Sequence, residues 1–153
     1  MTATSLNHVS ICAPDLDVAI RFYREVLGLE ELPTPNFGFP VRWMRVGSLQ
    51  LHLFEKPEQI PTFQHLALTV DDFEAVYRKA RELGILDNDT FGHHLYLLPG
   101  QNVQLYLRDP SGNLIEIDWP DVTSLDPDLI SEIRPLPQPQ GQMNLRSTLF
   151  LSR

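Results

Sequence analysis

Apolar and polar residues alternate in several short stretches of the chain, which is the pattern of strands that bury one face. In the clearest stretch, residues 103–118, two alternating segments flank Asp109-Pro110-Ser111-Gly112, a sequence typical of a tight turn. We therefore predict two strands joined by a turn there. Further strands are predicted at residues 6–11, 41–46, 49–54 and 63–70, and the proline-rich residues 32–40 are predicted to form a loop.

Two longer stretches carry apolar residues at the spacing of an amphipathic helix. In both, an aspartate that can cap the first turn comes before the stretch, and a glycine that can end the helix comes after it. The predicted helices cover residues 16–27, between Asp15 and Gly28, and residues 73–83, between Asp71 or Asp72 and Gly84.

The order of these elements is repeated along the chain. His65 follows His8 by 57 positions, and an aspartate that can cap the next helix lies 7 positions after each of these histidines. A fixed offset between like residues indicates an internal duplication, here of a strand, a helix and several further strands. By this duplication His52, near the end of the first copy, corresponds to Glu116, near the end of the second.

The composition is that of a globular protein, because 42% of the 153 residues are hydrophobic and 21% are charged. No apolar run approaches the ~20 residues that a membrane-spanning helix needs. The formal net charge of −8 argues against binding to nucleic acid. Cys12 is the only cysteine, and residues 1–5 lack the features of a signal peptide. We therefore expect a cytoplasmic protein without disulfides, whose partner is a small molecule rather than nucleic acid or membrane.

Prolines become frequent after Pro120. We expect residues 121–153 to form a C-terminal extension, with a short helix that Asp126 caps and that continues to Ile133. A strand is predicted at residues 145–151. The sequence assigns this extension no role.

Three histidines and one glutamate lie on strand faces opposite the aliphatic residues, and the aliphatic faces are where the two helices can pack. Imidazole nitrogens and a carboxylate that converge from separate strands suit a divalent transition metal. The four candidate ligands are His8, His52, His65 and Glu116.

An interpretation without a metal is also open. In it, Glu116 pairs with Arg108 or Arg42, and the histidines are ordinary core or surface residues. The repetition of His8 and His65 at equivalent positions favours the metal, because packing alone gives no reason for it.

Three segments resemble the vicinal oxygen chelate superfamily, which includes glyoxalase I and extradiol dioxygenases. They are the strand 6–11, the helix with Phe22-Tyr23 and Leu27-Gly28-Leu29, and residues 109–116. The resemblance covers residues 5–120 and implies an α+β fold. Two tandem βαβββ modules, at about residues 5–57 and 63–120, then form a cupped mixed sheet around a metal-binding cleft, with the helices on the outer face.

The resemblance also implies the cofactor and the assembly. The metal is a divalent ion of nickel, zinc, cobalt, manganese or iron(II), and its ligands carry over to His8, His52, His65 and Glu116. Gln50 faces the same way as His52 one pleat earlier, so that either residue is a candidate for the fourth ligand. Such modules are expected to form a homodimer.

Two reactions are compatible with the resemblance. In a glyoxalase-I-like lyase or isomerase, the metal stabilises an enediolate-type intermediate of a small oxygenated substrate, and Glu116 is the base. In an extradiol ring-cleaving dioxygenase, His8, His65 and Glu116 hold iron(II), Tyr106 lies near the metal, and His52 is the acid–base group. A third hypothesis is a small-molecule binding protein without catalysis.

The predicted catalytic residues are thus Glu116, Tyr106 and His52. The residues predicted to contact substrate are Arg42, Trp43, Gln50, Gln104 and Arg108. Phe37, Phe39, Trp43, Met44 and Tyr106 indicate that part of the substrate is apolar.

Overall fold

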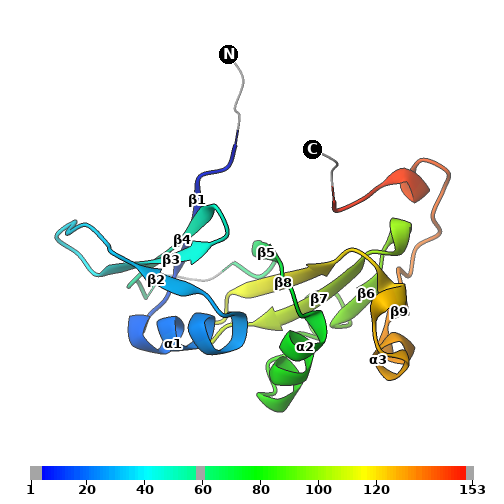
Figure 1. Cartoon of the computed structure of the whole chain (residues 1–153), viewed down its shortest axis with the longest axis horizontal. Coiled ribbons are helices and arrows are strands. Elements are labelled where there is room, and N and C mark those ends of the chain that lie inside the picture. Colours follow the sequence, from blue (N-terminus) through cyan, green and yellow to red (C-terminus); the bar gives the residue numbers. More distant parts are fainter. Residues whose placement is uncertain (1–4, 58–60, 151–153) are drawn as a thin grey trace. The chain divides into compact units, whose positions relative to one another are not determined.

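The computed structural model describes residues 5–57 and 61–150, and Figure 1 shows their helices and strands. The chain divides into two compact units. Unit 1 is Met1–Gln64 with Asp109–Asn113, and unit 2 is His65–Arg108 with Leu114–Arg153. No helix in the described ranges is long and apolar enough to cross a membrane.

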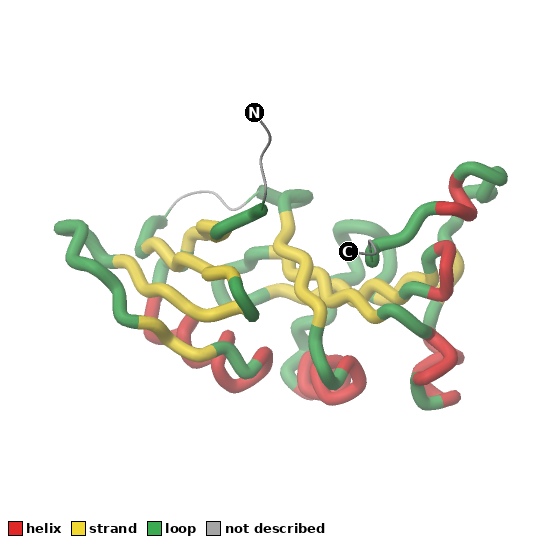
Figure 2. The backbone as a smooth tube through the Cα atoms, turned by 45° about the horizontal axis from the view of Figure 1, so that its top comes forward, coloured by secondary structure: helices red, strands yellow, loops and turns green. Residues whose placement is uncertain are grey.

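Unit 1 is built on a four-stranded mixed sheet in the order β1-β4-β3-β2. β1 (His8–Cys12) runs parallel to β4 (Leu49–Phe54), and β3 (Val41–Val46) runs antiparallel to both β4 and β2 (Glu30–Leu32). The helix α1 (Leu16–Leu27) packs along one face of this sheet, as Figure 2 shows. The described residues of unit 1 place no helix on the other face.

Unit 2 repeats this plan in a five-stranded sheet of the order β5-β8-β7-β6-β9. Its first four strands have the order and directions of β1-β4-β3-β2, which confirms the predicted duplication. The helix α2 packs against β8. The bounds are β5 (His65–Thr69), α2 (Phe73–Glu82), β6 (Leu95–Leu97), β7 (Val103–Arg108), β8 (Leu114–Trp119) and β9 (Arg134–Pro135).

The caps predicted from the sequence are present at both long helices. The Asp15 carboxylate accepts a hydrogen bond from the Val18 N–H at 3.0 Å, and the Asp72 carboxylate accepts one from the Ala75 N–H at 2.9 Å. Gly28 ends α1 in the left-handed conformation, with φ of +66°, and its N–H donates to the Arg24 carbonyl. These contacts satisfy backbone groups that the helix itself leaves unpaired.

Short elements account for the differences from the predicted fold. Strands β2 and β6 were not predicted, because a three-residue strand is too short to show an alternation. The strand expected at residues 145–151 is wrong: η3 (Asn144–Arg146) is a 3-10 turn, no strand follows it to residue 150, and Leu151 lies outside the described residues. Two further 3-10 turns are η1 (Pro99–Gln101) and η2 (Val122–Ser124).

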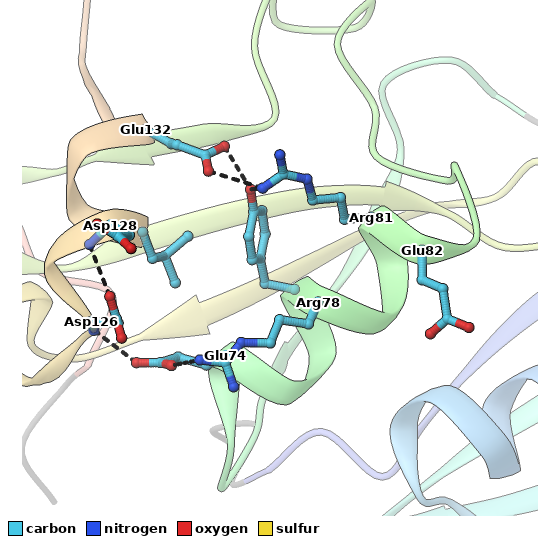
Figure 3. Close-up of a pocket in the computed structure, with 9 residues that line it drawn as sticks. Glu74, Arg78, Arg81, Glu82, Asp126, Asp128 and Glu132 are labelled. Atoms are coloured by element: carbon cyan, nitrogen blue, oxygen red, sulfur yellow. Dashed lines mark hydrogen bonds and ion pairs between the residues drawn. The ribbon is translucent and has the colours of Figure 1, made fainter.

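The described part of the C-terminal extension, residues 121–150, contributes secondary structure to unit 2. Asp126 caps α3 (Pro127–Glu132), as predicted, and β9 then pairs in parallel with β6. Figure 3 shows α3 beside α2, where the Tyr77 hydroxyl donates to Glu132 at 2.6 Å. Further along, the Leu149 N–H donates to the Asn102 side chain at 3.2 Å. The extension therefore adds a helix and an edge strand to the duplicated plan.

A buried carboxylate organises the turn at residues 109–113 of unit 1. Asp109 is only 4% exposed and accepts hydrogen bonds from the Tyr23 hydroxyl at 2.9 Å and the Asn113 side chain at 2.8 Å. The Ser111 and Asn113 N–H groups also donate to it. Burial raises the pKa of Asp109, and the bonds from Asn113 and Tyr23 act in the opposite direction.

Removing one of these donors tests the network. We expect Tyr23→Phe to lower the free energy of unfolding by about 1.5–3 kcal/mol, because the hydrogen bond to a buried carboxylate is lost while the ring stays. Urea denaturation followed by circular dichroism measures the change. Ser111→Ala is the matched control, since only the backbone N–H of Ser111 contacts Asp109. Equal stability of Tyr23→Phe and the natural protein would contradict this account.

Candidate functional site

His52 lies at the middle of the helix-free face of unit 1, because β4 is flanked there by β1 and β3. Ser10 of β1 and Trp43 of β3 are its neighbours in register. The His52 ring is stacked against His8, with ring centroids 4.2 Å apart, and against Trp43, with centroids 4.4 Å apart. Its Nε2 lies 2.9 Å from Gln50 Oε1. The duplication and the alternation of β4 therefore bring together His8, Trp43, Gln50 and His52 on this face.

Electrostatics favour the neutral form of His52. Burial, and to a lesser degree the neighbouring His8, lowers its pKa from the ordinary histidine value. A neutral imidazole keeps the lone pair that a metal or a proton requires. The strand register also makes His52, rather than Gln50, the counterpart of Glu116, because Ser10–His52 and Ala67–Glu116 are equivalent pairs.

A cavity of about 500 Å³ opens on this face, a volume typical of small-molecule sites. Both polar side chains and aromatic rings line it. The lining residues are Asn7, His8, Ser10, Phe37, Phe39, Trp43, Gln50, His52 and Phe54.

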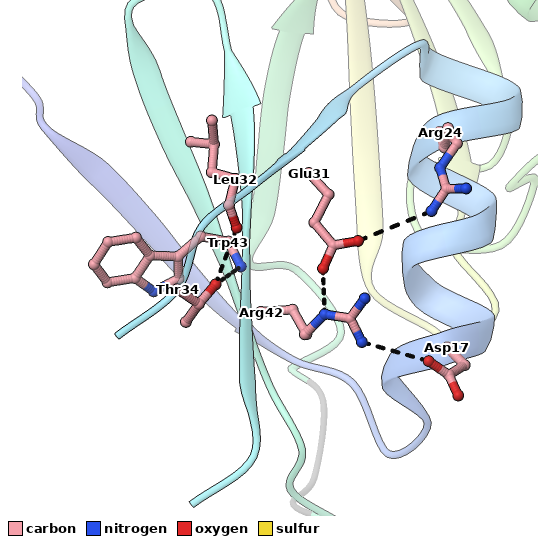
Figure 4. Close-up of polar contacts among 7 residues, drawn as sticks. All are labelled: Asp17, Arg24, Glu31, Leu32, Thr34, Arg42 and Trp43. Carbon is pink, nitrogen blue, oxygen red and sulfur yellow. Dashed lines mark hydrogen bonds and ion pairs between the residues drawn. The ribbon is translucent and has the colours of Figure 1, made fainter. Parts of the chain in front are cut away.

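Arg42 and Met44 lie on the opposite face of β3. Met44 is fully buried and faces Leu51 in register, in the layer of aliphatic residues that α1 covers. Figure 4 shows the Arg42 guanidinium between Glu31 and Asp17 of α1, with the Asp17 contact at 3.5 Å. The structure therefore does not bring Arg42 or Met44 to the face of His52. The expectation that both accompany Trp43 overlooked the alternation of a strand.

In unit 2, Glu116 occupies the position equivalent to His52. It is 3% exposed, and its Oε2 lies 3.2 Å from His65 Nε2. Gln104 donates to the other carboxylate oxygen at 2.5 Å, and the Tyr106 hydroxyl donates to Gln104 Oε1 at 3.0 Å. A buried carboxylate thus has a polar partner at each oxygen. The structure thus brings His65, Gln104, Tyr106 and Glu116 together on one strand face of unit 2.

Tyr106 lies opposite Glu116 in register, as Trp43 lies opposite His52. Burial and the charge of Glu116 raise the pKa of Tyr106 well above its ordinary value. The phenol therefore keeps its proton at neutral pH and acts as a hydrogen-bond donor. Its ring also packs with Tyr96 and Leu114, so it contributes to the core of unit 2.

Arg108 ends the same strand and contacts the segment between α2 and β6, residues 83–94. This segment is longer than the equivalent link in unit 1, residues 28–29, and is called the insertion. Its Nε donates to Asp87 at 2.6 Å, and its guanidinium also donates to Thr90 at 2.5 Å. Phe91, in the same segment, lies against Tyr106 with ring centroids 4.7 Å apart. These contacts give Arg108 a role in holding the insertion. Its predicted contact with substrate stays a prediction.

Asp118 was absent from the residues singled out in the sequence. It lies two residues after Glu116 on the same strand face and is 8% exposed. Burial, followed by the hydrogen bond and charge of Glu116, raises the pKa of Asp118 to about 8. Asp118 therefore keeps its proton at neutral pH. Side chains two positions apart in a strand share a face, so the position of Glu116 already indicated that Asp118 lies beside it.

The donor pairs can be compared with the requirements of a divalent metal. Two ligands about 2.1 Å from an ion, at tetrahedral or octahedral angles, lie roughly 3.0–3.4 Å apart. The separation of His65 Nε2 and Glu116 Oε2, 3.2 Å, fits this range. Within residues 5–57 and 61–150, no three His, Cys, Asp or Glu side chains form a metal-holding group. The complete set of four ligands stays a prediction.

Comparison with known proteins identifies the family. Residues 5–117 match the family model of the Glyoxalase/Bleomycin resistance protein/Dioxygenase superfamily, and the chain belongs to this superfamily. Its two βαβββ modules agree with that assignment and confirm the predicted fold class. The oxidase ChaP-H2 has a similar solved structure, with a TM-score of 0.62 and 27% identity over 76% of this chain and 94% of that one.

The relatives of known activity catalyse different reactions. Glyoxylase I 4 of Arabidopsis thaliana is 28% identical, over 96% of this chain and 93% of its own length. The mitochondrial methylmalonyl-CoA epimerase of Mus musculus is 28% identical, over 74% of this chain and 71% of its own length. Biphenyl-2,3-diol 1,2-dioxygenase of Metapseudomonas furukawaii is 27% identical, over 74% of this chain and 40% of its own length. The similarity supports an enzyme and leaves several reactions open.

The pKa of Asp118 predicts a pH dependence of stability for the metal-free protein. Asp118 keeps its proton in the folded state up to about pH 8, whereas an unfolded aspartate loses it near pH 3.9. At Asp118 the folded state therefore binds more protons between these values, and the contribution of Asp118 to the free energy of unfolding falls as the pH rises from about 4 to 8.

Asp118→Asn should reduce this fall by on the order of 2 kcal/mol, because the amide is neutral throughout. Urea unfolding of chelator-treated protein at several pH values measures the effect. Asp89→Asn, at an exposed aspartate, is the control. Parallel pH profiles for the natural protein and Asp118→Asn would contradict the assignment.

Proposed function

We propose that this chain is a divalent-metal-dependent lyase or isomerase of glyoxalase-like type, which acts on a small oxygenated substrate. The observation that carries the proposal is Glu116, a buried carboxylate on a strand face, held at hydrogen-bond distance from His65 and Gln104. A glutamate is almost never buried so fully unless it is paired, and the basic side chain beside Glu116 is a histidine, which is also a common metal ligand. The similarity to glyoxylase I and to an epimerase supports this reaction class.

His65 and Glu116 are the proposed ligands from unit 2, and His8 and His52 are the proposed ligands from unit 1. A bound divalent ion would supply a Lewis acid that stabilises negative charge developing on a substrate oxygen. Gln50 is the alternative to His52, and its contact with the His52 ring suits a residue that orients this ring.

Glu116 is the proposed base. Its Oε2 would accept a proton from the substrate carbon next to a carbonyl and return it to the neighbouring position, so that no proton is gained or lost overall. Gln104 holds the other carboxylate oxygen, and Tyr106 in turn donates to Gln104. These two residues would therefore fix the orientation of the carboxylate. His52 would serve as a second group for proton transfer.

An extradiol dioxygenase is the second candidate, and Tyr106 is the observation that favours it. A protonated phenol directly opposite the candidate ligand Glu116 can donate a hydrogen bond to a bound oxygen group. The likeness to biphenyl-2,3-diol 1,2-dioxygenase agrees with this reaction. In that case His8, His65 and Glu116 would hold iron(II), and His52 would transfer the proton.

Metal retention tests the ligand assignment. We expect the natural protein, purified without a histidine tag and without oxygen, to contain about one divalent ion per chain, removable by chelator. His65→Ala and Glu116→Gln should each lower metal content at least tenfold at equal circular dichroism, because each removes one ligand. Elemental analysis gives the stoichiometry, and His94→Gln is the control. Full metal content in His65→Ala would overturn the assignment.

The identity of the metal separates the two candidates. Nickel, cobalt or zinc, with turnover of a glutathione hemithioacetal or epimerisation of an acyl thioester, would support the lyase or isomerase. Iron or manganese, with ring cleavage of a catechol, would support the dioxygenase. A protein that retains none of these ions when each is offered would contradict both, and would leave the hypothesis of a binding protein without catalysis.

A further inference from the structure

The cavity of unit 1 has a wall of aromatic rings. Phe39 lies between Phe37 and Phe54, with ring centroids 5.9 and 5.8 Å away, and both neighbouring rings are inclined by only 25° to it. On its other side, the Phe37 ring contacts the Trp43 ring, with centroids 5.9 Å apart. Phe37 and Phe39 are nonetheless 49% and 46% exposed, so large parts of both rings are accessible. Exposed aromatic faces of this kind offer stacking and edge contacts to a flat molecule.

The cavity also lacks charge. No lysine, arginine, aspartate or glutamate lines it in the described part of unit 1. Neither arginine of β3 is among the residues that line the cavity. Arg42 pairs with Glu31 on the opposite face, and Arg45, which lies opposite Gln50 in register, pairs with Glu30 at 3.1 Å. The polar atoms of the cavity belong instead to amide, hydroxyl and imidazole groups of Asn7, Ser10, Gln50, His8 and His52.

Charge complementarity restricts the occupant. A ligand with several carboxylates or phosphates, as in glutathione or coenzyme A, needs cations to replace the water that it loses on binding. No lysine or arginine lines this cavity, on a chain of net charge −8. A neutral flat ring system needs no such partner and gains from contact with Phe37 and Phe39.

We propose that this cavity binds a neutral aromatic molecule that carries hydroxyl or carbonyl oxygens, rather than a glutathione or coenzyme A adduct. The ring would lie against Phe37 and Phe39, and its oxygens would point toward the polar end at Ser10, Gln50 and His52. That this molecule is the substrate rests on the proposed function, and both candidate reactions accommodate an oxygenated ring.

Trp43 provides a direct readout, because it lines the cavity, whereas Trp119 belongs to unit 2. Chelator-treated full-length protein would be titrated with 2-naphthol, S-methylglutathione and acetyl-CoA while tryptophan emission is recorded. We expect saturable quenching by 2-naphthol and none by the other two compounds at equal concentration. Trp43→Phe should abolish the quenching signal, because it removes the reporting indole. Equilibrium dialysis of the natural protein should give the same affinity for 2-naphthol as the quenching titration.

Phe39→Ala should weaken 2-naphthol binding about tenfold, since its ring contacts would be lost. Phe63→Ala is the matched control, because Phe63 is an exposed phenylalanine of unit 1 that does not line the cavity. Absence of saturable 2-naphthol binding, unchanged binding in Phe39→Ala, or tighter binding of either thiol-derived compound would overturn the proposal.

The result is separable from that of the metal experiment. Metal retention without 2-naphthol binding would refute the proposed aromatic ligand, while the proposal of a metal-dependent enzyme would be unaffected. Binding of 2-naphthol that requires Phe39, in a protein that never retains metal, would support the aromatic ligand and refute the metal enzyme.

Discussion

The register of the parallel pairs β1–β4 and β5–β8 is the constraint on which the sites depend. In a strand, every second side chain points to the same face, so a slip of one residue would exchange the two faces. The observed register directs Leu51, Leu53, Ile115 and Ile117 into the buried layers of the two units. It thereby leaves His52 and Glu116 on the other face. Burial of ordinary aliphatic residues thus positions the candidate chemistry.

The two copies of the module use this shared position differently. In unit 1 the residue there is an imidazole stacked between two rings, and the cavity beside it is lined by no lysine, arginine, aspartate or glutamate. In unit 2 it is a carboxylate with a second carboxyl group, Asp118, two residues away, which keeps its proton at neutral pH. One copy therefore offers a surface suited to recognition of a ring, and the other offers a group suited to proton transfer. Divergence after duplication explains this division without any change of fold.

Most of the fold could be predicted from the sequence, because its signals are local. The aspartate caps, the terminal glycines and the alternation of long strands each lie within a few residues. The sites were harder to predict. A shift of one position moves a side chain to the other face of a strand, and the residues that contact it lie far away in the sequence. Arg42 was predicted to contact substrate together with Trp43. Its ion pair with Glu31, on the neighbouring strand β2, holds it instead on the face that α1 covers. Asp118 escaped notice because aspartate at a strand end usually lies in solvent.

The extension after Pro120 has a consequence for the outer border of the second sheet. β9 hydrogen-bonds to β6 and becomes the last strand, and its second residue is Pro135. Proline has no N–H to donate, so a further strand would find an incomplete row of donors there. Pro137 follows closely and continues the interruption. This border is therefore a poor template for another polypeptide, and it protects the protein against edge-to-edge aggregation.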